Sequence, residues 1–169
     1  MYTVKHALLF KEHVRNGEAL VFFIDVRTGG KGYEEFLLRA KDEEKVTYIR
    51  GKPGRIVKNE KGLVIWVTDT LTGRPMRIPC DMVVLSTAMM PSANARDLAR
   101  ILKIQVDDHG FLAEAHPKLR PVESLVSGFY LAGCAQAPKD IPDAVAQASA
   151  AASKVLEMFS RKELSAEVY

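Results

Sequence analysis

The most informative part of this chain is the stretch Gly128-Phe-Tyr-Leu-Ala-Gly-Cys-Ala-Gln-Ala-Pro-Lys-Asp-Ile-Pro-Asp-Ala-Val-Ala-Gln-Ala-Ser-Ala-Ala-Ala152. Residues 129–132 predict a short apolar strand. Gly133 allows a sharp turn after it because glycine has no Cβ. Asp140 is typical of the N-cap of a helix, so the pattern predicts strand, turn, polar loop and helix in that order.

The helix predicted after Asp140 is unusually thin. Pro142 and Asp143 fit its first turn, where a missing N–H and a carboxylate are both tolerated. The residues that follow are mostly small: Ala144, Ala146, Ala148, Ala150, Ala151 and Ala152. A thin helix whose positive end faces the crevice at a strand end suits a bound anionic or flat polar cofactor.

The composition is that of an ordinary globular protein of 169 residues, 47% hydrophobic and 27% charged. The net charge of +3 is too small to argue for nucleic-acid binding. No apolar run reaches about 18 residues and no signal peptide opens the chain, which predicts a cytoplasmic protein without a membrane span. Cys80 and Cys134 are the only cysteines, and the four histidines share no ligand spacing, so no metal site is expected.

The first half of the chain predicts an α/β arrangement. Apolar residues recur at helical spacing over residues 2–14, and a strongly apolar run over residues 19–26 predicts a buried parallel strand. A helix over residues 33–44 and a strand over residues 46–49 complete a β-α-β unit. Three segments that alternate in polarity then predict an antiparallel meander: residues 55–58, 63–68 and 76–78.

The remaining segments are predicted from apolar runs and turn residues. We expect a strand over residues 82–86, a helix over residues 93–102 and a hairpin around residues 107–110. An extended connector is expected at residues 117–121. The charged residues after about Arg161 are expected to fray.

One glycine-rich turn is a weak signal for phosphate binding. Thr28-Gly-Gly-Lys-Gly-Tyr-Glu-Glu lies between a predicted strand and a predicted helix. Its spacing is neither GxGxxG nor a Walker loop, and Lys31 is not followed by Ser or Thr.

The stretch around Gly133 resembles the C-terminal flavin-contacting segment of thioredoxin-reductase-like flavoproteins. In that class an apolar strand ends in Ala-x-Gly-Asp, and a helix start faces the flavin. Here Gly133-Cys134 stands where Gly-Asp is usual, so Cys134 replaces the carboxylate that binds the ribityl chain. Gly-Cys-Ala-Gln-Ala-Pro-Lys-Asp-Ile-Pro resembles the A-type subunit of heterodisulfide reductase, its flavin and iron–sulfur subunit, and the resemblance extends over essentially all 169 residues.

Two further segments carry the same resemblance. Asp81-Met-Val-Val-Leu-Ser-Thr-Ala-Met-Met-Pro91 is similar to the crossover that returns the chain to the flavin domain in this class. Met1-Tyr2-Thr3-Val4-Lys5 is similar to the segment that follows a cysteine cluster proposed to hold an iron–sulfur centre. The resemblance therefore implies a truncated chain that covers about the last third of the flavoprotein core, without the upstream flavin GxGxxG.

The resemblance implies a partial two-dinucleotide-binding-domain flavoprotein fold. Residues 1–90 would be a remnant of the nicotinamide-type nucleotide domain, and residues 91–169 the C-terminal part of the FAD-binding domain. The β-α-β unit and the meander would belong to the first, and the strand–helix FAD segment to the second.

The resemblance also implies a set of FAD-binding residues. These are Thr87, Ala88, Gly133, Cys134, Ala135, Gln136, Lys139, Asp140, Ile141, Pro142, Ala144 and Val145. Lys5 is either a cation that tunes the flavin potential or an ordinary exposed helix lysine. Cys134 is either a packing or flavin-contact residue or a redox thiol.

Two hypotheses about function remain. The first is a fragment of an FAD-dependent, iron–sulfur-linked oxidoreductase subunit that works with other heterodisulfide-reductase-type subunits, with electron bifurcation as an open alternative. On this hypothesis the iron–sulfur cluster belongs to the intact subunit, and the isolated chain binds FAD weakly and lacks activity. The second is a non-catalytic module that self-associates as a homo-oligomer without flavin, because it lacks the glycine-rich loop.

Overall fold

The computed structural model describes residues 1–60 and 62–160. The chain divides into two compact units, Met1–Ser86 and Thr87–Tyr169. Their boundary lies close to the change in organisation predicted near residue 90. The predicted fraying after about Arg161 concerns residues outside the described part. Each unit is described by itself below.

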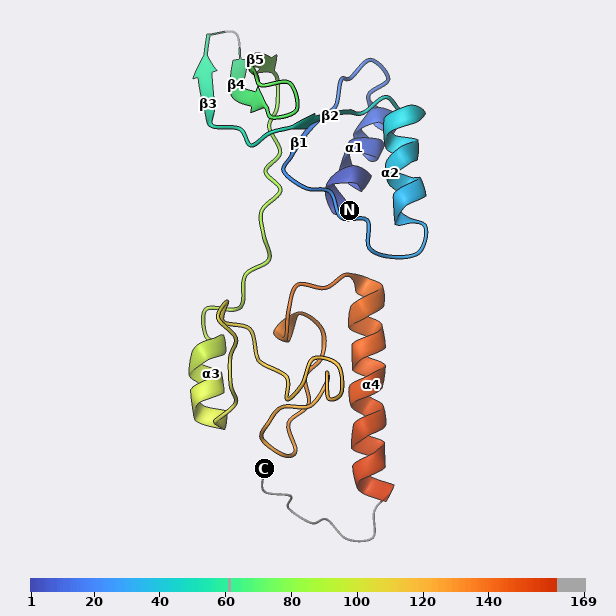
Figure 1. Cartoon of the computed structure of the whole chain (residues 1–169), viewed down its shortest axis with the longest axis vertical. Helices are drawn as coiled ribbons and strands as arrows, with labels where there is room; N and C mark the ends of the chain where they lie inside the picture. The colour runs from blue at the N-terminus through green and yellow to red at the C-terminus, as the bar shows by residue number, and fades with distance from the viewer. Residues whose placement is uncertain (61, 161–169) are drawn as a thin grey trace. The chain divides into compact units, whose positions relative to one another are not determined.

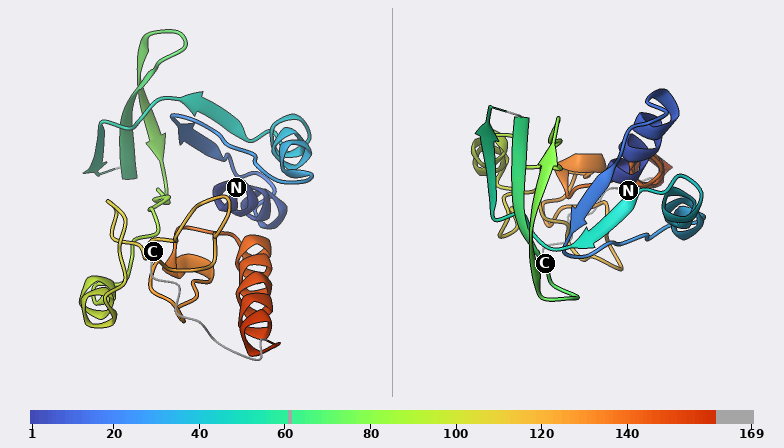
Figure 2. Two further views of the ribbon diagram at one scale, coloured as in Figure 1. Left: turned by 60° about the horizontal axis from the view of Figure 1, so that its bottom comes forward. Right: turned by 90° about the horizontal axis from the view of Figure 1, so that it is seen from above.

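The first unit begins with a parallel β-α-β unit. Helix α1 (Tyr2–His13) precedes strand β1 (Leu20–Phe23), helix α2 (Tyr33–Asp42) and strand β2 (Thr47–Arg50). Strands β1 and β2 pair in parallel, with Leu20 opposite Thr47, and Figure 2 shows them side by side. The crossover through α2 is what parallel pairing requires, because parallel strands cannot be joined by a tight turn.

A small core holds this β-α-β unit together. Two residues of α1, two of α2 and one before β2 are buried and cluster together: Val4, Leu8, Leu37, Ala40 and Val46. The predicted helical spacing of apolar residues in α1 and α2 is therefore confirmed. Strand β1 is shorter than the apolar run 19–26 suggests, since Ile24 is exposed and Asp25 pairs with Arg27.

The predicted antiparallel meander is confirmed. Strands β3 (Arg55–Asn59), β4 (Gly62–Asp69) and β5 (Arg74–Cys80) form a three-stranded sheet in the order β3-β4-β5 (Figure 1). Alternate residues of β4, Ile65 and Val67, are buried, as expected for a sheet with one covered face.

A short backbone bond joins the meander to the parallel pair: Thr70 N–H, just after β4, donates to Arg50 O of β2 at 2.7 Å. Beside it, Gly51 N–H extends the parallel pair by donating to Phe23 O of β1 at 2.8 Å. A Cβ on Gly51 would lie 2.2 Å from Thr68 O, so the chain passes here too closely for any side chain. Glycine is required at this junction for lack of space rather than for a special φ.

The strand predicted over residues 82–86 is wrong. This segment has no strand assignment, and Met82, Val84 and Leu85 are between 69% and 76% exposed. A parallel strand is stabilised by hydrogen bonds to neighbouring strands, and in the described part of the first unit the parallel sheet consists of β1 and β2 alone. An apolar run without a strand beside it therefore stays irregular. Cys80 is half-buried, and burial together with the Asp81 charge raises the pKa of its thiol.

The described part of the second unit, residues 87–160, consists of helices and many turns. It contains α3 (Ala95–Leu102), the short 3₁₀ helix η1 (Gly133–Ala135) and α4 (Ile141–Ser160). The strand predicted over residues 129–132 is reduced to a single bridge between Glu123 and Tyr130. The segment lacks a second neighbour to pair with, although Leu131 N–H still donates to Val122 O at 2.7 Å.

Two turns of the second unit differ in how well they were predicted. The hairpin around residues 107–110 is confirmed, with Asp107 Oδ1 accepting from Phe111 N–H at 2.8 Å. The extended connector predicted at residues 117–121 is wrong. His116 Nδ1 accepts from the N–H groups of Lys118 and Leu119, which closes the segment into a tight loop.

Candidate functional site

The candidate site is the segment of residues 133–147, which joins η1 to the first turns of α4. Gly133 has a φ of +64°, a left-handed conformation that glycine adopts without strain. Its carbonyl accepts from Gln136 N–H at 3.2 Å, and Ala135 O accepts from Leu112 N–H at 3.0 Å. The predicted glycine turn is thus present and is tied to the hairpin before it.

Two glutamines fix this turn against α4. Gln147 Oε1 accepts from Gly133 N–H at 2.7 Å, and Gln147 Nε2 donates to Gln136 Oε1. Gln136 Nε2 donates in turn to Glu114 Oε2 at 2.7 Å, and both amide groups also reach Pro121 O. The network holds the η1 loop at a fixed place on the helix.

Sequence reasoning missed part of this network. It selected Gln136 but neither Gln147 nor Glu114. Gln147 offered a signal, because it is the one long polar side chain in the alanine-rich run after residue 143. Glu114 offered none, since it comes from a distant part of the chain.

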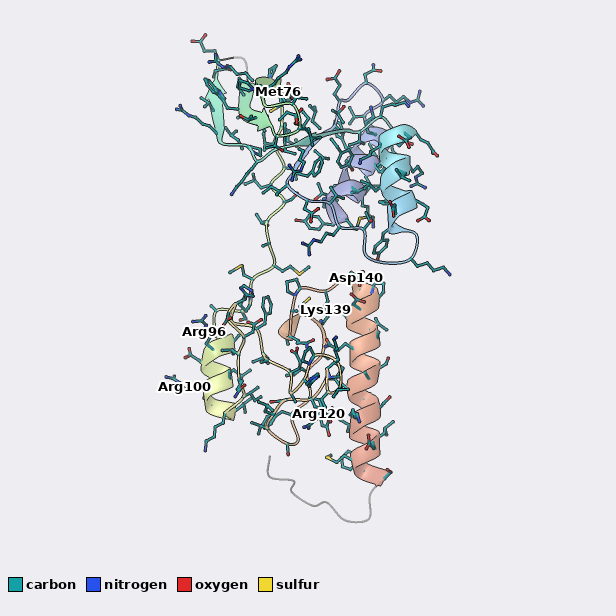
Figure 3. All side chains as sticks on the ribbon, viewed as in Figure 1. Met76, Arg96, Arg100, Arg120, Lys139 and Asp140 are labelled. Carbon is teal, nitrogen blue, oxygen red and sulfur yellow. The ribbon has the colours of Figure 1, made fainter. Side chains whose placement is uncertain are left out.

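The start of α4 carries the predicted cap. Asp140 Oδ1 accepts from Asp143 N–H at 2.9 Å, and Asp140 O accepts from Ala144 N–H at 3.0 Å. Ile141, which is 80% exposed, contributes the one first-turn N–H without an acceptor among the described residues. Figure 3 labels Lys139 and Asp140 at this end of the helix. The carboxylates of Asp140 and Asp143 offset part of the helix dipole's attraction for an anion.

Cys134 lies exposed in the η1 turn. Its Sγ is 3.8 Å from Lys139 O and 4.0 Å from Met89 Sδ, both within hydrogen-bonding range for sulfur. An exposed side chain does not pack in a core, so a buried packing role for Cys134 does not apply. Flavin contact and a redox role are the two that remain. The choice between flavin contact and redox thiol stays a prediction.

The remaining predicted residues are Lys5, Thr87 and Ala88. Lys5 is on α1, in a shallow groove that also involves Glu12, Phe36 and Arg39 of the first unit. Thr87 and Ala88 are exposed and begin the second unit. Within the second unit, the structure therefore brings together the predicted residues from Gly133 to Val145.

The segment fits one side of a flavin in part. Small side chains line it, and a Cβ at Gly133 would be in ordinary contact with Ala144 at 3.8 Å, which shows how closely the turn approaches the helix. The Ile141 N–H supplies a donor. A carboxylate for the ribityl hydroxyls is absent at position 134, and no GxGxxG occurs in the sequence to hold a pyrophosphate. These residues suit contact with the ring and ribityl end, not the adenosine end.

The glycine turn before α2 differs from the one before α4. Gly32 caps α2 in a left-handed conformation without a side-chain bond, and Glu34 and Glu35 occupy the first turn. Two carboxylates at a helix start disfavour a bound anion. This agrees with the weak phosphate-loop signal in the sequence.

Two negative findings apply to the described residues, 1–60 and 62–160. They contain no group of three or more His, Cys, Asp or Glu side chains that could hold a metal ion. None of their helices combines the length and hydropathy needed to cross a bilayer.

The sequence is similar to curated archaeal proteins. It is 44% identical to the A-type subunit of the H₂:CoB–CoM heterodisulfide, ferredoxin reductase of Methanothermobacter marburgensis, over 91% of this chain and 24% of that protein. It is 44% identical to an iron–sulfur A-type subunit of the CoB–CoM heterodisulfide reductase of Methanopyrus kandleri, over 99% of this chain and 26% of that protein. An Archaeoglobus profundus protein named as similar to the A-type subunit of heterodisulfide reductase is 41% identical, over 99% of this chain and 24% of its own length. No family model matches the chain.

The fold is similar to that of two solved structures. Lactococcus lactis thioredoxin reductase matches with a TM-score of 0.62 at 19% identity, over 91% of this chain and 48% of that one. LpdA from Mycobacterium tuberculosis matches with a TM-score of 0.60 at 16% identity, over 91% of this chain and 33% of that one. The chain has a partial thioredoxin-reductase-like α/β fold, as predicted.

These comparisons confirm the resemblance inferred from the sequence motifs. The chain is a homologue of proteins named as A-type subunits of heterodisulfide reductase. It spans about a quarter of the length of the curated relatives it matches.

Proposed function

We propose that this chain provides the flavin-contacting C-terminal part of an electron-transferring subunit of the heterodisulfide reductase type. Its homology to A-type subunits supports an oxidoreductase role. The observation that carries the proposal is the bond between Gly133 N–H and Gln147 Oε1, which holds the η1 turn on the first turns of a thin helix. A flat cofactor needs a rigid, small-residue surface of this kind.

The residues have distinct roles in this proposal. The backbone of residues 133–136 and the Ile141 N–H would contact the ribityl and ring side of FAD. The side chains of Ala144 and Val145 are short, so they would leave room for the cofactor. Asp140 and Pro142 fix where α4 begins, and Lys139 adds a positive charge beside this end of the helix. A bound flavin supplies the chemistry of accepting an electron pair and releasing electrons singly.

The proposed cofactors, partners and compartment concern a longer subunit of which this chain would be a part. We propose that FAD is held fully only when a glycine-rich loop is also present, and that the iron–sulfur cluster named for a relative belongs to other parts of such a subunit. Other heterodisulfide-reductase-type subunits are the proposed partners, and the cytoplasm the proposed compartment. Thr87, Ala88 and Lys5 keep their proposed roles as crossover residues and flavin-tuning cation, and electron bifurcation is a finer proposal that rests on the same homology.

A specific observation favours the second hypothesis, self-association without flavin. One face of α4 carries large apolar side chains at helical spacing, each more than 60% exposed: Ile141, Val145, Leu156 and Phe159. The apolar face would be covered if two copies packed α4 against α4.

The deciding experiment is the visible absorption spectrum of the purified chain before and after FAD is added and the sample is desalted. Retained bands near roughly 370 and 450 nm would support flavin contact by this chain. Ala144→Leu should abolish retention, because it adds bulk beside Gly133. Ala150→Leu, the same change at an exposed position of α4, is the matched control and should retain the bands.

A colourless protein after desalting would argue against tight flavin binding by this chain. Light scattering then tests the second hypothesis. A dimer or larger oligomer that Phe159→Glu converts to monomer would support self-association through α4. A colourless monomer would contradict self-association. If such a monomer also leaves the fluorescence of FAD unchanged during a titration, the flavin proposal is contradicted too, because that proposal requires at least weak contact with FAD. Far-UV circular dichroism of each variant separates loss of binding from loss of fold.

A further inference from the structure

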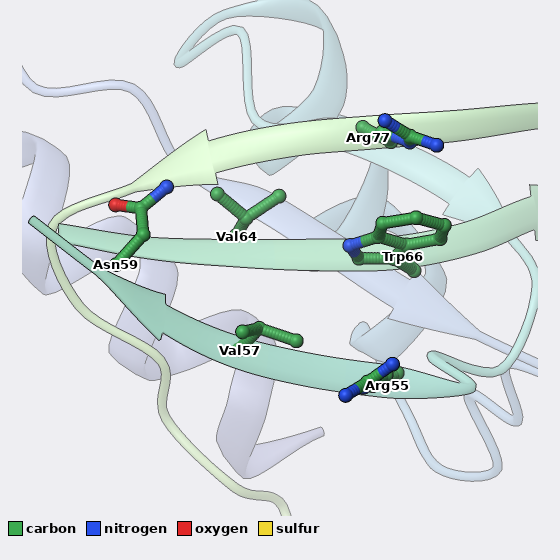
Figure 4. A pocket seen from close by; sticks show the side chains of 6 residues that line it. All are labelled: Arg55, Val57, Asn59, Val64, Trp66 and Arg77. Carbon is green, nitrogen blue, oxygen red and sulfur yellow. The ribbon is translucent and has the colours of Figure 1, made fainter. Parts of the chain in front are cut away.

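The outer face of the meander carries a row of three side chains, a tryptophan with one arginine on each side. Arg55 of β3 lies opposite Trp66 of β4, and Trp66 lies opposite Arg77 of β5. Figure 4 shows the three side chains in one row across the sheet, with Val57 and Val64 in the next row. Trp66 is the only tryptophan of the chain and is 40% exposed.

The position of Trp66 on the outer face follows from the strand period. Its neighbours Ile65 and Val67 are 5% exposed and point to the covered face of the sheet. Side chains alternate along a strand, so Trp66 must point the other way. A large aromatic side chain left in water marks a surface that gains stability when something covers it.

The charges on this face have one sign. The residues that line the shallow depression are Arg55, Val57, Asn59, Val64, Trp66 and Arg77, with no carboxylate among them. Among the described residues, neither arginine forms an ion pair. The Arg77 guanidinium carbon lies 3.9 Å from the centre of the Trp66 ring. Stacking restricts the Arg77 side chain, so less conformational entropy is lost when it binds an anion.

We propose that this face, the Arg55–Trp66–Arg77 row, docks an acidic amphipathic helix of a partner protein. Strands β3 and β5 are separated by two strand spacings, about 9.5 Å. Two glutamates seven residues apart on a helix are separated by about 10.5 Å along its axis, on one face. Such a helix can place a carboxylate on each arginine and apolar side chains on Trp66, Val57 and Val64.

Two features favour a protein partner over other occupants. The depression is shallow, as protein interfaces are, whereas small-molecule sites are concave, and arginine and tryptophan are typical of the residues that contribute most to such interfaces. In β5, Pro75 and Pro79 lack the N–H that strand addition at that edge would need. Strand addition at the β5 edge is therefore disfavoured, and a partner that contacts Trp66 and both arginines must lie on the face of the sheet. The inference is independent of the flavin proposal, since the row lies in the first unit and residues 133–147 in the second.

The test uses the full chain and a synthetic helical peptide with two glutamates seven residues apart and leucines between them. A second peptide carries glutamine in place of glutamate. Binding is measured by anisotropy of the labelled peptide and by Trp66 emission, which reports on this face alone. We expect saturable binding of the glutamate peptide, weakened about tenfold or more by Arg55→Gln or Arg77→Gln and by added salt.

Arg74→Gln is the matched control. Arg74 is exposed on the same strand as Arg77 but three positions away, so its side chain points to the opposite face of the sheet. Binding should be unchanged in this variant. The proposal is overturned if the glutamate peptide does not bind, or if the glutamine peptide binds equally well. It is also overturned if Arg74→Gln weakens binding as much as Arg77→Gln. A small anionic ligand is tested with ATP: saturation of the Trp66 signal by ATP, with no effect of the glutamate peptide, would overturn the proposal as well.

Discussion

The two units of this chain are stabilised in different ways. The first unit, Met1–Ser86, contains all five strands of the described chain, and its helices share a buried core. The second unit, as far as residue 160, contains helices, turns and three isolated bridges. Its longest helix, α4, has one buried residue, Ala151. Both units bury apolar side chains, including Phe111, Val122 and Leu131 in the second. Strand pairing stabilises the first unit in addition, whereas side-chain hydrogen bonds hold the turns of the second.

This difference predicts which substitutions matter in each unit. In the first unit the positions most sensitive to change are those where elements pass too closely for added atoms. In the second unit the sensitive positions are polar side chains that satisfy buried backbone groups. Residues 133–147, the proposed flavin-contacting segment, belong to the second kind.

The largest effect is expected for Gly51→Ala. The new Cβ would lie 2.2 Å from Thr68 O, so the junction between β2 and the meander must shift. We expect a loss of about 2–4 kcal/mol in the free energy of unfolding of the first unit. Chemical denaturation followed by Trp66 fluorescence measures it.

Gly54→Ala, three residues along the chain, is the control for this prediction. A Cβ there meets nothing closer than 3.9 Å, and its φ is not in the left-handed region. The substitution should leave stability unchanged or raise it by about 0.4–1 kcal/mol, because alanine restricts the unfolded chain. Equal losses in both variants would show that close approach is not what limits residue 51.

An intermediate effect is expected for Gln147→Leu. The change removes the acceptor of Gly133 N–H and the donor to Gln136 Oε1. We expect the second unit to lose about 1–3 kcal/mol, the usual cost of leaving such groups unsatisfied. Helical circular dichroism during denaturation measures it. Gln105→Leu, the same change at an exposed position, should have little effect, and a comparable loss there would contradict the proposed role of the network.

The smallest effect is expected from Asp69, the last residue of β4. The Leu71 N–H, then the Thr72 hydroxyl and N–H, lower the pKa of this exposed carboxyl below its usual value of 3.8. A carboxyl with a lowered folded pKa stabilises the fold above its unfolded pKa, and this contribution is lost as the pH falls through the folded value. Asp69→Asn should therefore flatten slightly the acid dependence of first-unit stability, measured by Trp66 fluorescence between about pH 2 and 6.

Asp42→Asn is the control for the pH measurement. Asp42 lies in the last turn of α2, and among the described residues its carboxylate has no hydrogen-bond partner. Its replacement should leave the acid dependence as it is in the natural chain. An identical flattening in both variants would attribute the effect to net charge instead of to the turn.

Sequence patterns predicted the local elements well where an element is a helix or where its pairing partner follows it directly in the sequence. The meander followed from alternating polarity, and α4 followed from Asp140 and the alanine run. The pattern failed at residues 82–86 and 129–132, where apolar runs were interpreted as strands. A strand exists only with a neighbour to pair with, and composition does not say whether that neighbour is present.

In the candidate site, too, contacts within one continuous stretch were predictable and contacts between distant stretches were not. Gly133, Gln136 and Asp140 were predicted because they belong to one continuous motif, and their turn and cap contacts are present. Glu114 could not be predicted, since its contact with Gln136 joins residues that are 22 positions apart. Lys5 was predicted by resemblance alone, and the structure places it in a groove of the first unit.

The sequence by itself determined the α/β character, the turn at Gly133, the cap at Asp140 and the homology to heterodisulfide reductase proteins, because these depend on neighbouring residues or on a continuous motif. Only the tertiary structure decided which apolar runs became strands, how Gln147 and Glu114 hold the η1 turn, and that Arg55, Trp66 and Arg77 share one face. These features depend on pairing and register between segments that are distant in the sequence. Hydrogen bonding between strands and packing between elements are set when the chain folds, and no single stretch of residues contains them.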